Sequence, residues 1–157
     1  ENIPGQWRYE MQGLGFNYRM NEMQAALGLS QLKRLEKIVY RRNIIHKKYK
    51  EYLKNLPLKL IEVPDNVYSS FHLAVIQLDD KQIHQKVFAG MRKNGIGVQL
   101  HYSPVHLQPF YKKFGFRKGD FPKAEEYASR SFSLPLYPEL TDYNLKKIVQ
   151  ILKELIK

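Results

Sequence analysis

The sequence contains no cysteine among its 157 residues. Disulfides and thiolate-bound metals are therefore excluded, and a reducing compartment is allowed. No apolar run approaches the roughly 20 residues that a membrane-spanning helix needs, and no signal-peptide core opens the chain. The sequence also lacks an initiator methionine and begins at Glu1, so we expect it to be the interior of a longer protein or a processed piece.

Acidic residues are comparatively few, since 15 Asp and Glu stand against 26 Lys and Arg, for a net charge of +11. Such an excess is compatible with nucleic acid, an anionic membrane surface or acidic small molecules as partners. The cations are spread along the expected helices, as in Lys33-Arg34 and Arg41-Arg42, and no RNP, zinc-finger or basic-zipper pattern accompanies them. We therefore expect a solvated basic face, with neither nucleic acid nor membrane as a partner.

Motifs that make or break bonds are missing too. The chain has no nucleophile elbow, P-loop, dinucleotide fingerprint or Cys–His arrangement. No pair among its five histidines has a helical metal-binding spacing with a carboxylate between, so we predict no metal site and no catalytic residue. His46 and His84 lie among charged residues and are expected on the surface. His101 and Tyr102 end an expected strand, a common place for binding groups, although a histidine at a strand end is more often structural than catalytic.

Apolar residues make up 43% of the chain, so a buried core is expected. From residue 20 to residue 56 they recur at three- and four-residue steps without a proline, which predicts a long helical segment. Because this exceeds the usual length of a globular helix, the segment is either one long connecting helix or two helices that meet near Gly28 or Asn43.

Strands and shorter helices are expected after Pro57, and their turn signals and apolar patterns set the limits. The expected strands are 58–63, 71–78 and 97–102, and the expected helices are 81–93, 110–114, 122–131 and one that opens at Thr141-Asp142. The order β-β-α-β predicts a small sheet with a helix on it. The segment 134–138 should be extended, because residues before proline are pushed out of the helical region.

One stretch, Gly13 to Gly28, carries the clearest local signal. Asn21 can cap a helix, and Gln24, three residues on, can complete a capping box. Asn17 and Arg19 come just before that helix start, where backbone N–H groups and the helix dipole favour an anion. An amide and a guanidinium suit a phosphate or a carboxylate. The plainer interpretation, a glycine loop with a cap and a surface arginine, stays open.

The motifs in their order resemble those of one family, the DegT/DnrJ/StrS sugar aminotransferases. They are Trp7-x-Tyr9, the run from Gly15 to Leu32, Phe71-His-Leu, Gly95-Ile96, His101-Tyr-Ser-Pro-Val-His106, Pro109-x-Tyr111, Pro122-x-Ala-Glu125 and Ser133-Leu-Pro-Leu-Tyr-Pro138. The resemblance spans nearly the whole chain. It implies the α/β fold of a fold type I enzyme that depends on pyridoxal 5'-phosphate (PLP), of which this chain is the later, α+β part.

The resemblance also implies a domain organisation. Residues 1–19 correspond to the tail end of the large PLP domain with an interface loop, 20–56 to the long connecting helix, and 57–157 to a C-terminal small domain with a small antiparallel sheet and helices. The family's Schiff-base lysine, its aspartate on the pyridine nitrogen and its aromatic ring stacker have no counterpart in this sequence. If the chain is complete as given, we expect it to be inactive in transamination.

Site residues carry over by motif position. Asn17 matches the family asparagine that binds the cofactor phosphate of the neighbouring subunit. Arg19 is expected near the same site or near the nucleotide-sugar. Gln99, His101 and Tyr102 are candidates for binding the substrate, because the matching family segment borders the sugar-nucleotide pocket.

The implied enzyme is a cytoplasmic homodimer of surface-polysaccharide or glycan biosynthesis. It moves an amino group from glutamate to a UDP- or dTDP-linked ketosugar. Two other functions stay open, a PLP-dependent sugar dehydratase of the same family and a stand-alone basic binding module. For a partial chain, residues 1–18 should be disordered, swapped or packed on a second copy. For a stand-alone module, Trp7 and Phe16 should be buried within the chain.

Overall fold

The computed structural model describes residues 13–157. The chain divides into two compact units, Glu1–Arg34 and Leu35–Lys157, and each is described by itself. Trp7, Tyr9 and most of the expected interface segment 1–19 lie outside the described residues.

The described part of the N-terminal unit, residues 13–34, has an irregular segment followed by one helix, α1 (Glu22–Leu32). The predicted capping box is confirmed: Gln24 N donates to Asn21 Oδ1 at 2.9 Å, and Asn21 N donates to Gln24 Oε1 at 3.1 Å. Two of the four unpaired N–H groups at the helix start are thereby satisfied. No residue of α1 is buried, and Phe16 is largely exposed as well.

The long helical segment is not one helix. α1 ends at Leu32 and α2 (Leu35–Leu53) begins after a two-residue turn at Lys33 and Arg34. Arg34 N donates to Gln31 O at 3.0 Å, a short-range bond that tightens the last turn. The break therefore falls at neither Gly28 nor Asn43, and no glycine or proline marks it in the sequence. The assignment of 20–56 to a connecting element stays a prediction.

The C-terminal unit is built on a three-stranded antiparallel sheet with the order β1-β2-β3. Its strands are β1 (Leu58–Leu60), β2 (Ala74–Leu78) and β3 (Ser131–Leu134). Leu58 pairs with Leu78, and Ala74 pairs with Leu134, so β2 lies in the centre. The prediction of a strand at 97–102 is wrong: that segment forms one isolated bridge, Gln99 to Ser133, beside β3. The third strand comes instead from the residues that directly follow α5.

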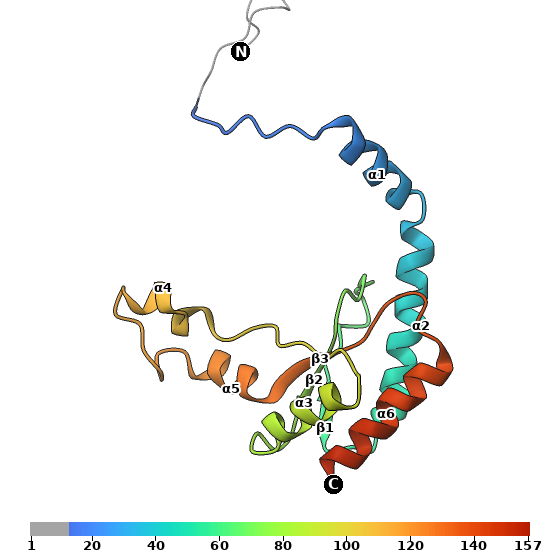
Figure 1. The fold of residues 1–157 in the computed structure, drawn as a ribbon, viewed down its shortest axis with the longest axis vertical. Coiled ribbons are helices and arrows are strands. Elements are labelled where there is room, and N and C mark those ends of the chain that lie inside the picture. The colour runs from blue at the N-terminus through green and yellow to red at the C-terminus, as the bar shows by residue number, and fades with distance from the viewer. Residues whose placement is uncertain (1–12) are drawn as a thin grey trace, which may run out of the picture. The chain divides into compact units, whose positions relative to one another are not determined.

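Helices connect and cover these strands (Figure 1). They are α3 (His84–Lys93), the 3-10 helix η1 (Val105–Leu107), α4 (Pro109–Lys112), α5 (Pro122–Arg130) and α6 (Asp142–Ile156). Each expected helix is present with small shifts of its ends. α3 starts three residues late, because the Asp80 carboxylate accepts from Gln82 N and holds a turn there.

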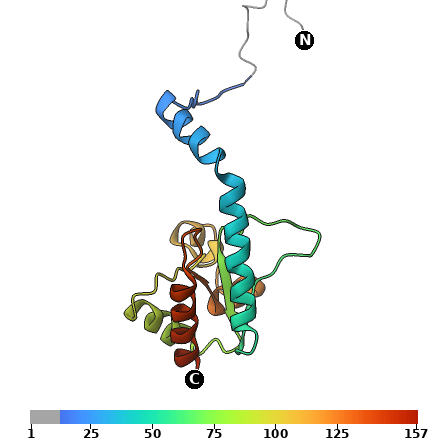
Figure 2. The same cartoon turned by 90° about the vertical axis from the view of Figure 1, so that its right-hand side faces the viewer.

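One core joins the sheet to α2, α3 and α6, and Figure 2 shows α2 running beside the strands. Fully buried side chains come from every one of these elements, and they include Tyr49, Ile76, Met91, Phe132 and Leu152. Burying large apolar side chains of this kind stabilises a fold by about 1.5–3 kcal/mol each. The predicted α+β class with a small antiparallel sheet is confirmed.

α2 also anchors the long connection between β1 and β2. Asn43 Nδ2 donates to Val39 O and to Ser69 O, both at 2.9 Å. His46 is buried and stacks on Phe71 with ring centroids 3.7 Å apart. The expectation of a surface His46 is therefore wrong, because the connection folds over this helix face. Phe71 itself has a φ of 40°, a positive value that residues other than glycine rarely adopt.

Candidate functional site

The segment before α1 brings the first two predicted site residues together. Arg19 Nε donates to Asn17 Oδ1 at 3.1 Å, and both side chains are exposed. Asn17 has a φ of 54°, in the left-handed region that asparagine tolerates better than most residues. The guanidinium donates to the amide oxygen, and the amide NH₂ is available to donate to a ligand.

The donor set at this segment fits the phosphate of PLP. The amide NH₂ of Asn17 and the remaining N–H groups of Arg19 are donors without acceptor character, and one of the two residues is cationic. A phosphate dianion accepts several charge-assisted bonds of this kind. These residues can therefore hold the phosphate end of the cofactor, whereas its ring and aldehyde need groups from elsewhere.

In the C-terminal unit, His101 and Tyr102 follow the isolated bridge at Gln99 and line a pocket of about 260 Å³. Pro104, Leu107 and α5 form other walls of this pocket. Its polar side chains, besides His101 and Tyr102, are Ser103, Lys118, Glu125, Tyr127, Ser129 and Ser131. This arrangement offers cationic, carboxylate, hydroxyl and imidazole groups to a polar ligand.

A buried serine supports His101 from the sheet. His101 Nδ1 and Ser133 Oγ lie 2.8 Å apart in a hydrogen bond, and Ser133 is 4% exposed. The Ser133 backbone is fixed on both sides of its hydroxyl, since its N donates to Gln99 O at 2.8 Å and its O accepts from Gln99 N at 3.3 Å. The imidazole is therefore attached to a buried strand that is paired with the central strand β2.

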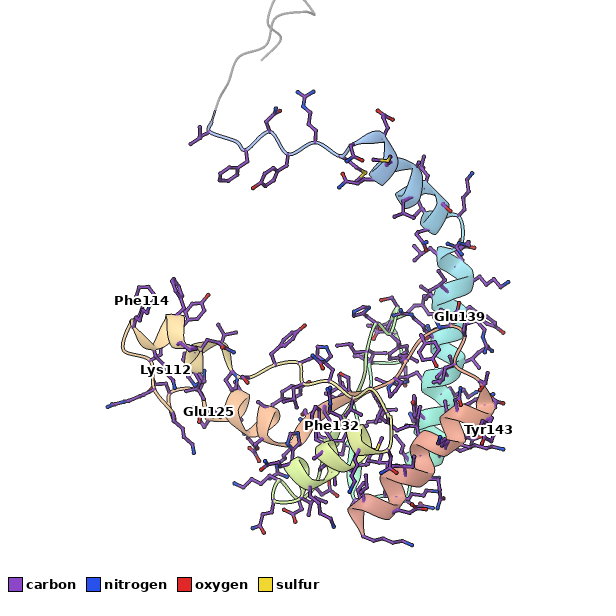
Figure 3. All side chains as sticks on the ribbon, viewed as in Figure 1. Lys112, Phe114, Glu125, Phe132, Glu139 and Tyr143 are labelled. Atoms are coloured by element: carbon purple, nitrogen blue, oxygen red, sulfur yellow. The ribbon has the colours of Figure 1, made fainter. Side chains whose placement is uncertain are left out.

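The carboxylate of Glu125 closes the long connection that leaves the sheet after Pro104 and returns to β3 through α5. We call this connection the excursion and the contacts of Glu125 the Glu125 clamp. Glu125 Oε1 lies 2.9 Å from His106 Nε2 and accepts from Gly119 N at 2.7 Å. The Gly119 N–H and, after it, His106 hold the pKa of the Glu125 carboxyl below its usual 4.5. Figure 3 shows Glu125 at the base of the excursion, with Lys112 and Phe114 towards its far end.

The predicted site residues thus fall into two groups, one in each unit. Asn17 and Arg19 contact one another, and His101 and Tyr102 line one pocket. Gln99 is exposed and does not line that pocket; it contributes the backbone pairing to Ser133. His72 is exposed, and its Nδ1 lies 3.4 Å from Arg42.

Sequence reasoning missed Ser131, Ser133 and Glu125 as parts of this region. Ser133 and Glu125 stand inside two of the motifs quoted above, Ser133-Leu-Pro-Leu and Pro122-x-Ala-Glu125. Their positions inside these motifs could therefore have indicated that Ser133 and Glu125 belong to the site. The sequence does not tell which side chains they contact. Ser131 carried no signal, because it was expected at the end of a helix.

Residues 2–153 match the model of the DegT/DnrJ/EryC1/StrS aminotransferase family. The chain belongs to this family. Among curated proteins it is 35% identical over 159 residues to the spore coat polysaccharide biosynthesis protein SpsC of Bacillus subtilis, covering 98% of this chain and 41% of SpsC. The chain thus spans about two-fifths of the length of the curated relatives it matches.

Solved structures agree with this membership. PseC of Helicobacter pylori, an aminotransferase involved in the biosynthesis of pseudoaminic acid, matches with a TM-score of 0.84 and 26% identity over 97% of this chain and 42% of PseC. Spr1654 of Streptococcus pneumoniae in its PLP form matches with a TM-score of 0.83 and 25% identity over 96% of this chain and 40% of Spr1654. Within the family, the sequence resembles the transaminase that makes UDP-4-amino-4,6-dideoxy-N-acetyl-altrosamine.

Proposed function

We propose that this chain is the C-terminal portion of a PLP-dependent aminotransferase that moves an amino group from glutamate to a nucleotide-linked ketosugar. Surface-polysaccharide or glycan biosynthesis is the process we propose for it, by analogy with SpsC and PseC. The observation that carries the proposal is the family match over residues 2–153 together with the Asn17–Arg19 donor pair. Among residues 13–157, no helix is long and apolar enough to span a membrane.

Asn17 and Arg19 are proposed to hold the phosphate of PLP, with Asn17 serving the cofactor of the neighbouring subunit in a homodimer. When bound, PLP supplies the carbonyl group that takes up an amino group from one substrate and passes it to another. The lysine that carries the cofactor is proposed to lie in the rest of the protein. The 157-residue chain alone should then show no transamination.

His101 and Tyr102 are proposed to orient the ketosugar from the wall of their pocket, with Gln99 next to them on the same segment. Lys118 offers a cation to a phosphate of the ligand, while the Glu125 carboxylate of the same pocket is bound by His106 and Gly119. The pocket side chains then bind and orient the substrate, and no proton transfer to or from the reacting carbon is assigned to them.

Amination of a UDP- or dTDP-linked ketosugar, assayed with the complete polypeptide and glutamate, tests the activity. Pyridoxal absorbance and an aminated sugar nucleotide are expected. Absence of both from every ketosugar in the panel overturns the proposal. A product that has lost water without gaining nitrogen supports the dehydratase instead.

Asn17→Ala in the complete polypeptide tests the phosphate contact. Losing one hydrogen bond to a charged group costs about 1.5–3 kcal/mol, so PLP affinity should fall by roughly 10- to 100-fold. Asn66→Ala, at an exposed asparagine on the β1–β2 connection, is the matched control and should leave PLP affinity unchanged.

A hybrid dimer tests whether Asn17 acts across the subunit boundary. A protomer with Asn17→Ala is combined with a protomer that lacks the cofactor lysine. If Asn17 serves the neighbouring subunit, the hybrid has one site with both groups and recovers part of the activity. If Asn17 serves its own subunit, no site has both groups and the mixture shows no more activity than the Asn17→Ala protein alone at the same PLP concentration.

A further inference from the structure

Among residues 13–157, the Ser133 hydroxyl has one hydrogen-bond partner. It is buried in β3, and within the described chain its Oγ makes a hydrogen bond to His101 Nδ1 alone, at 2.8 Å. The other buried serine of the same strand, Ser131, is the useful contrast, because its Oγ has no partner among residues 13–157 and it lines the pocket.

The number of donors decides whether the Ser133 hydroxyl or His101 Nδ1 donates the hydrogen in this bond. A hydroxyl has one hydrogen to donate, whereas a neutral imidazole has one N–H and one bare nitrogen. If Nδ1 carried the ring proton and donated to Ser133 Oγ, the serine hydrogen would be buried without an acceptor. Leaving a buried donor unpaired costs about 1–3 kcal/mol. If the hydroxyl instead donates to a bare Nδ1, both groups are satisfied.

We propose that Ser133 is a positioning residue that donates its hydroxyl hydrogen to His101 Nδ1 and so fixes the imidazole as the Nε2–H tautomer, a hydrogen-bond donor at the pocket wall. The tautomer follows from the contacts of the C-terminal unit alone. Its meaning for a sugar nucleotide rests on the proposed function.

This tautomer restricts what His101 can do. A neutral imidazole with Nε2–H donates to an oxygen of the ligand, such as a phosphate, hydroxyl or carbonyl oxygen, and offers no lone pair at Nε2 to accept a proton. Such a donor complements Lys118 on the same pocket, and Glu125 is already engaged by His106 and Gly119. His101 is thereby a group that recognises acceptor oxygens and not a general base at Nε2.

The tautomer is measured by NMR on the 157-residue chain labelled with ¹⁵N-histidine, through two-bond ¹H–¹⁵N correlations that separate protonated from bare ring nitrogens. The measurement is made at about pH 8.5, well above the ordinary histidine pKa of about 6.5. The loss of one set of peaks in His101→Gln assigns His101. The expected result is a bare, hydrogen-bonded Nδ1 and a protonated Nε2, and a protonated Nδ1 overturns the proposal.

Three variants separate positioning from a general loss of structure. In Ser133→Ala the Nδ1 resonance should move towards that of a nitrogen that accepts no hydrogen bond, and the Nδ1–H tautomer should gain population. Ser133→Thr keeps a hydroxyl and should retain the native resonance. Ser131→Ala removes the neighbouring buried hydroxyl and should leave the His101 resonances in place. Native His101 resonances in Ser133→Ala overturn the proposal, and the wild-type spectrum still decides it if the variants fail to fold.

A kinetic measurement on the complete polypeptide connects the tautomer with the substrate. Ser133→Ala should raise the KM for the nucleotide-linked ketosugar by roughly tenfold, the equivalent of one misdirected hydrogen bond, without changing the pyridoxal absorbance. An unchanged KM contradicts the role in recognition. If no ketosugar is aminated even by the unmodified protein, the proposed function fails while the NMR result stands.

Discussion

Two helices that both carry apolar residues at three- and four-residue steps differ sharply in what surrounds them. In α6, Leu145, Ile148 and Leu152 are buried in the core of the C-terminal unit. In α1, Met23 and Leu27 recur at the same spacing, yet they are 81% and 62% exposed. The periodicity of a sequence tells which face of a helix is apolar, but it does not tell which molecule covers that face.

The contrast extends to the two units as wholes. The C-terminal unit carries a continuous core of its own, whereas the described part of the N-terminal unit buries no residue. We propose that the α1 face is covered by the rest of the protein or by a second copy, in keeping with the dimer proposed above. Exposed apolar residues in such a number are typical of an interaction surface.

The largest expected effect is on the free energy of unfolding when one leucine on the apolar face of each helix is replaced by alanine. Leu152→Ala should lower the free energy of unfolding by about 2–5 kcal/mol, because it leaves a cavity in the core. Leu27→Ala on α1 is the matched variant and should change it by less than about 0.5 kcal/mol. Urea unfolding followed by circular dichroism measures both. Equal losses of unfolding free energy in the two variants would contradict the contrast between α6 and α1. A Leu27→Ala effect that grows with protein concentration would show that a second copy covers the α1 face.

A smaller effect is expected from a hydroxyl inside the core. Tyr49 OH donates to Pro135 O at 2.8 Å, and burial raises the pKa of this phenol well above its usual range. Tyr49→Phe leaves that carbonyl without its partner and should cost about 1–3 kcal/mol in the same unfolding experiment. Tyr40→Phe, on the exposed side of α2, is the control and should cost nothing measurable.

The buried histidine should make the C-terminal unit sensitive to acid. Burial lowers the pKa of His46 below 6.5, with Lys50 acting in the same direction and Ile61 O and Glu62 opposing it. The unfolded chain then binds a proton more readily than the folded one. Stability is therefore full above pH 6.5 and is lost as the pH falls below it, by at most about 1.4 kcal/mol per pH unit.

His46→Gln should flatten this dependence between the ordinary histidine pKa and the folded pKa, while His72→Gln on the exposed connection should keep it. Free energies of unfolding measured at a series of pH values check both variants. An unchanged slope in His46→Gln would show that other groups cause the acid sensitivity.

The smallest global effect is expected at the cap of α1. Asn21→Ala removes the oxygen that accepts from Gln24 N and should destabilise this helix by about 1 kcal/mol. Faster amide exchange at Gln24 and Ala25 measures the local loss, and Asn21→Asp should preserve protection. The unfolding transition of the C-terminal unit should not move, and a shift there would show that the two units are coupled.

Local signals in the sequence predicted the helices well. The Asn21 capping box, the proline in the first turn of α5 and the Thr141 cap of α6 each depend on neighbouring residues, and each is present. The sheet was predicted less well, because pairing depends on distant segments. Residues 97–102 have strand-like composition but meet β3 at one position only, whereas Ser131 takes up strand geometry through its pairing with Gln77.

The candidate site shows the same division. Asn17 and Arg19 are two residues apart, so their contact could be expected from the sequence. Ser133 lies 32 residues from His101 and Glu125 lies 19 residues from His106, and only the folded chain brings these groups together. His46 was assigned to the surface for the same reason, because the residue that covers it, Phe71, comes from a distant connection.

The Glu125 clamp also separates residues that must be kept, namely Glu125 and its partners, from the residues between them, which can be exchanged. One carboxylate binds both His106 and Gly119, so it closes the segment between them, which carries Phe110 and Phe114, at its base. Exposed tips of this kind tolerate exchange. Swapping residues 108–117 between relatives, while keeping the clamp and the pocket residues Leu107 and Lys118, is therefore a direct way to redesign which molecules this part of the protein contacts.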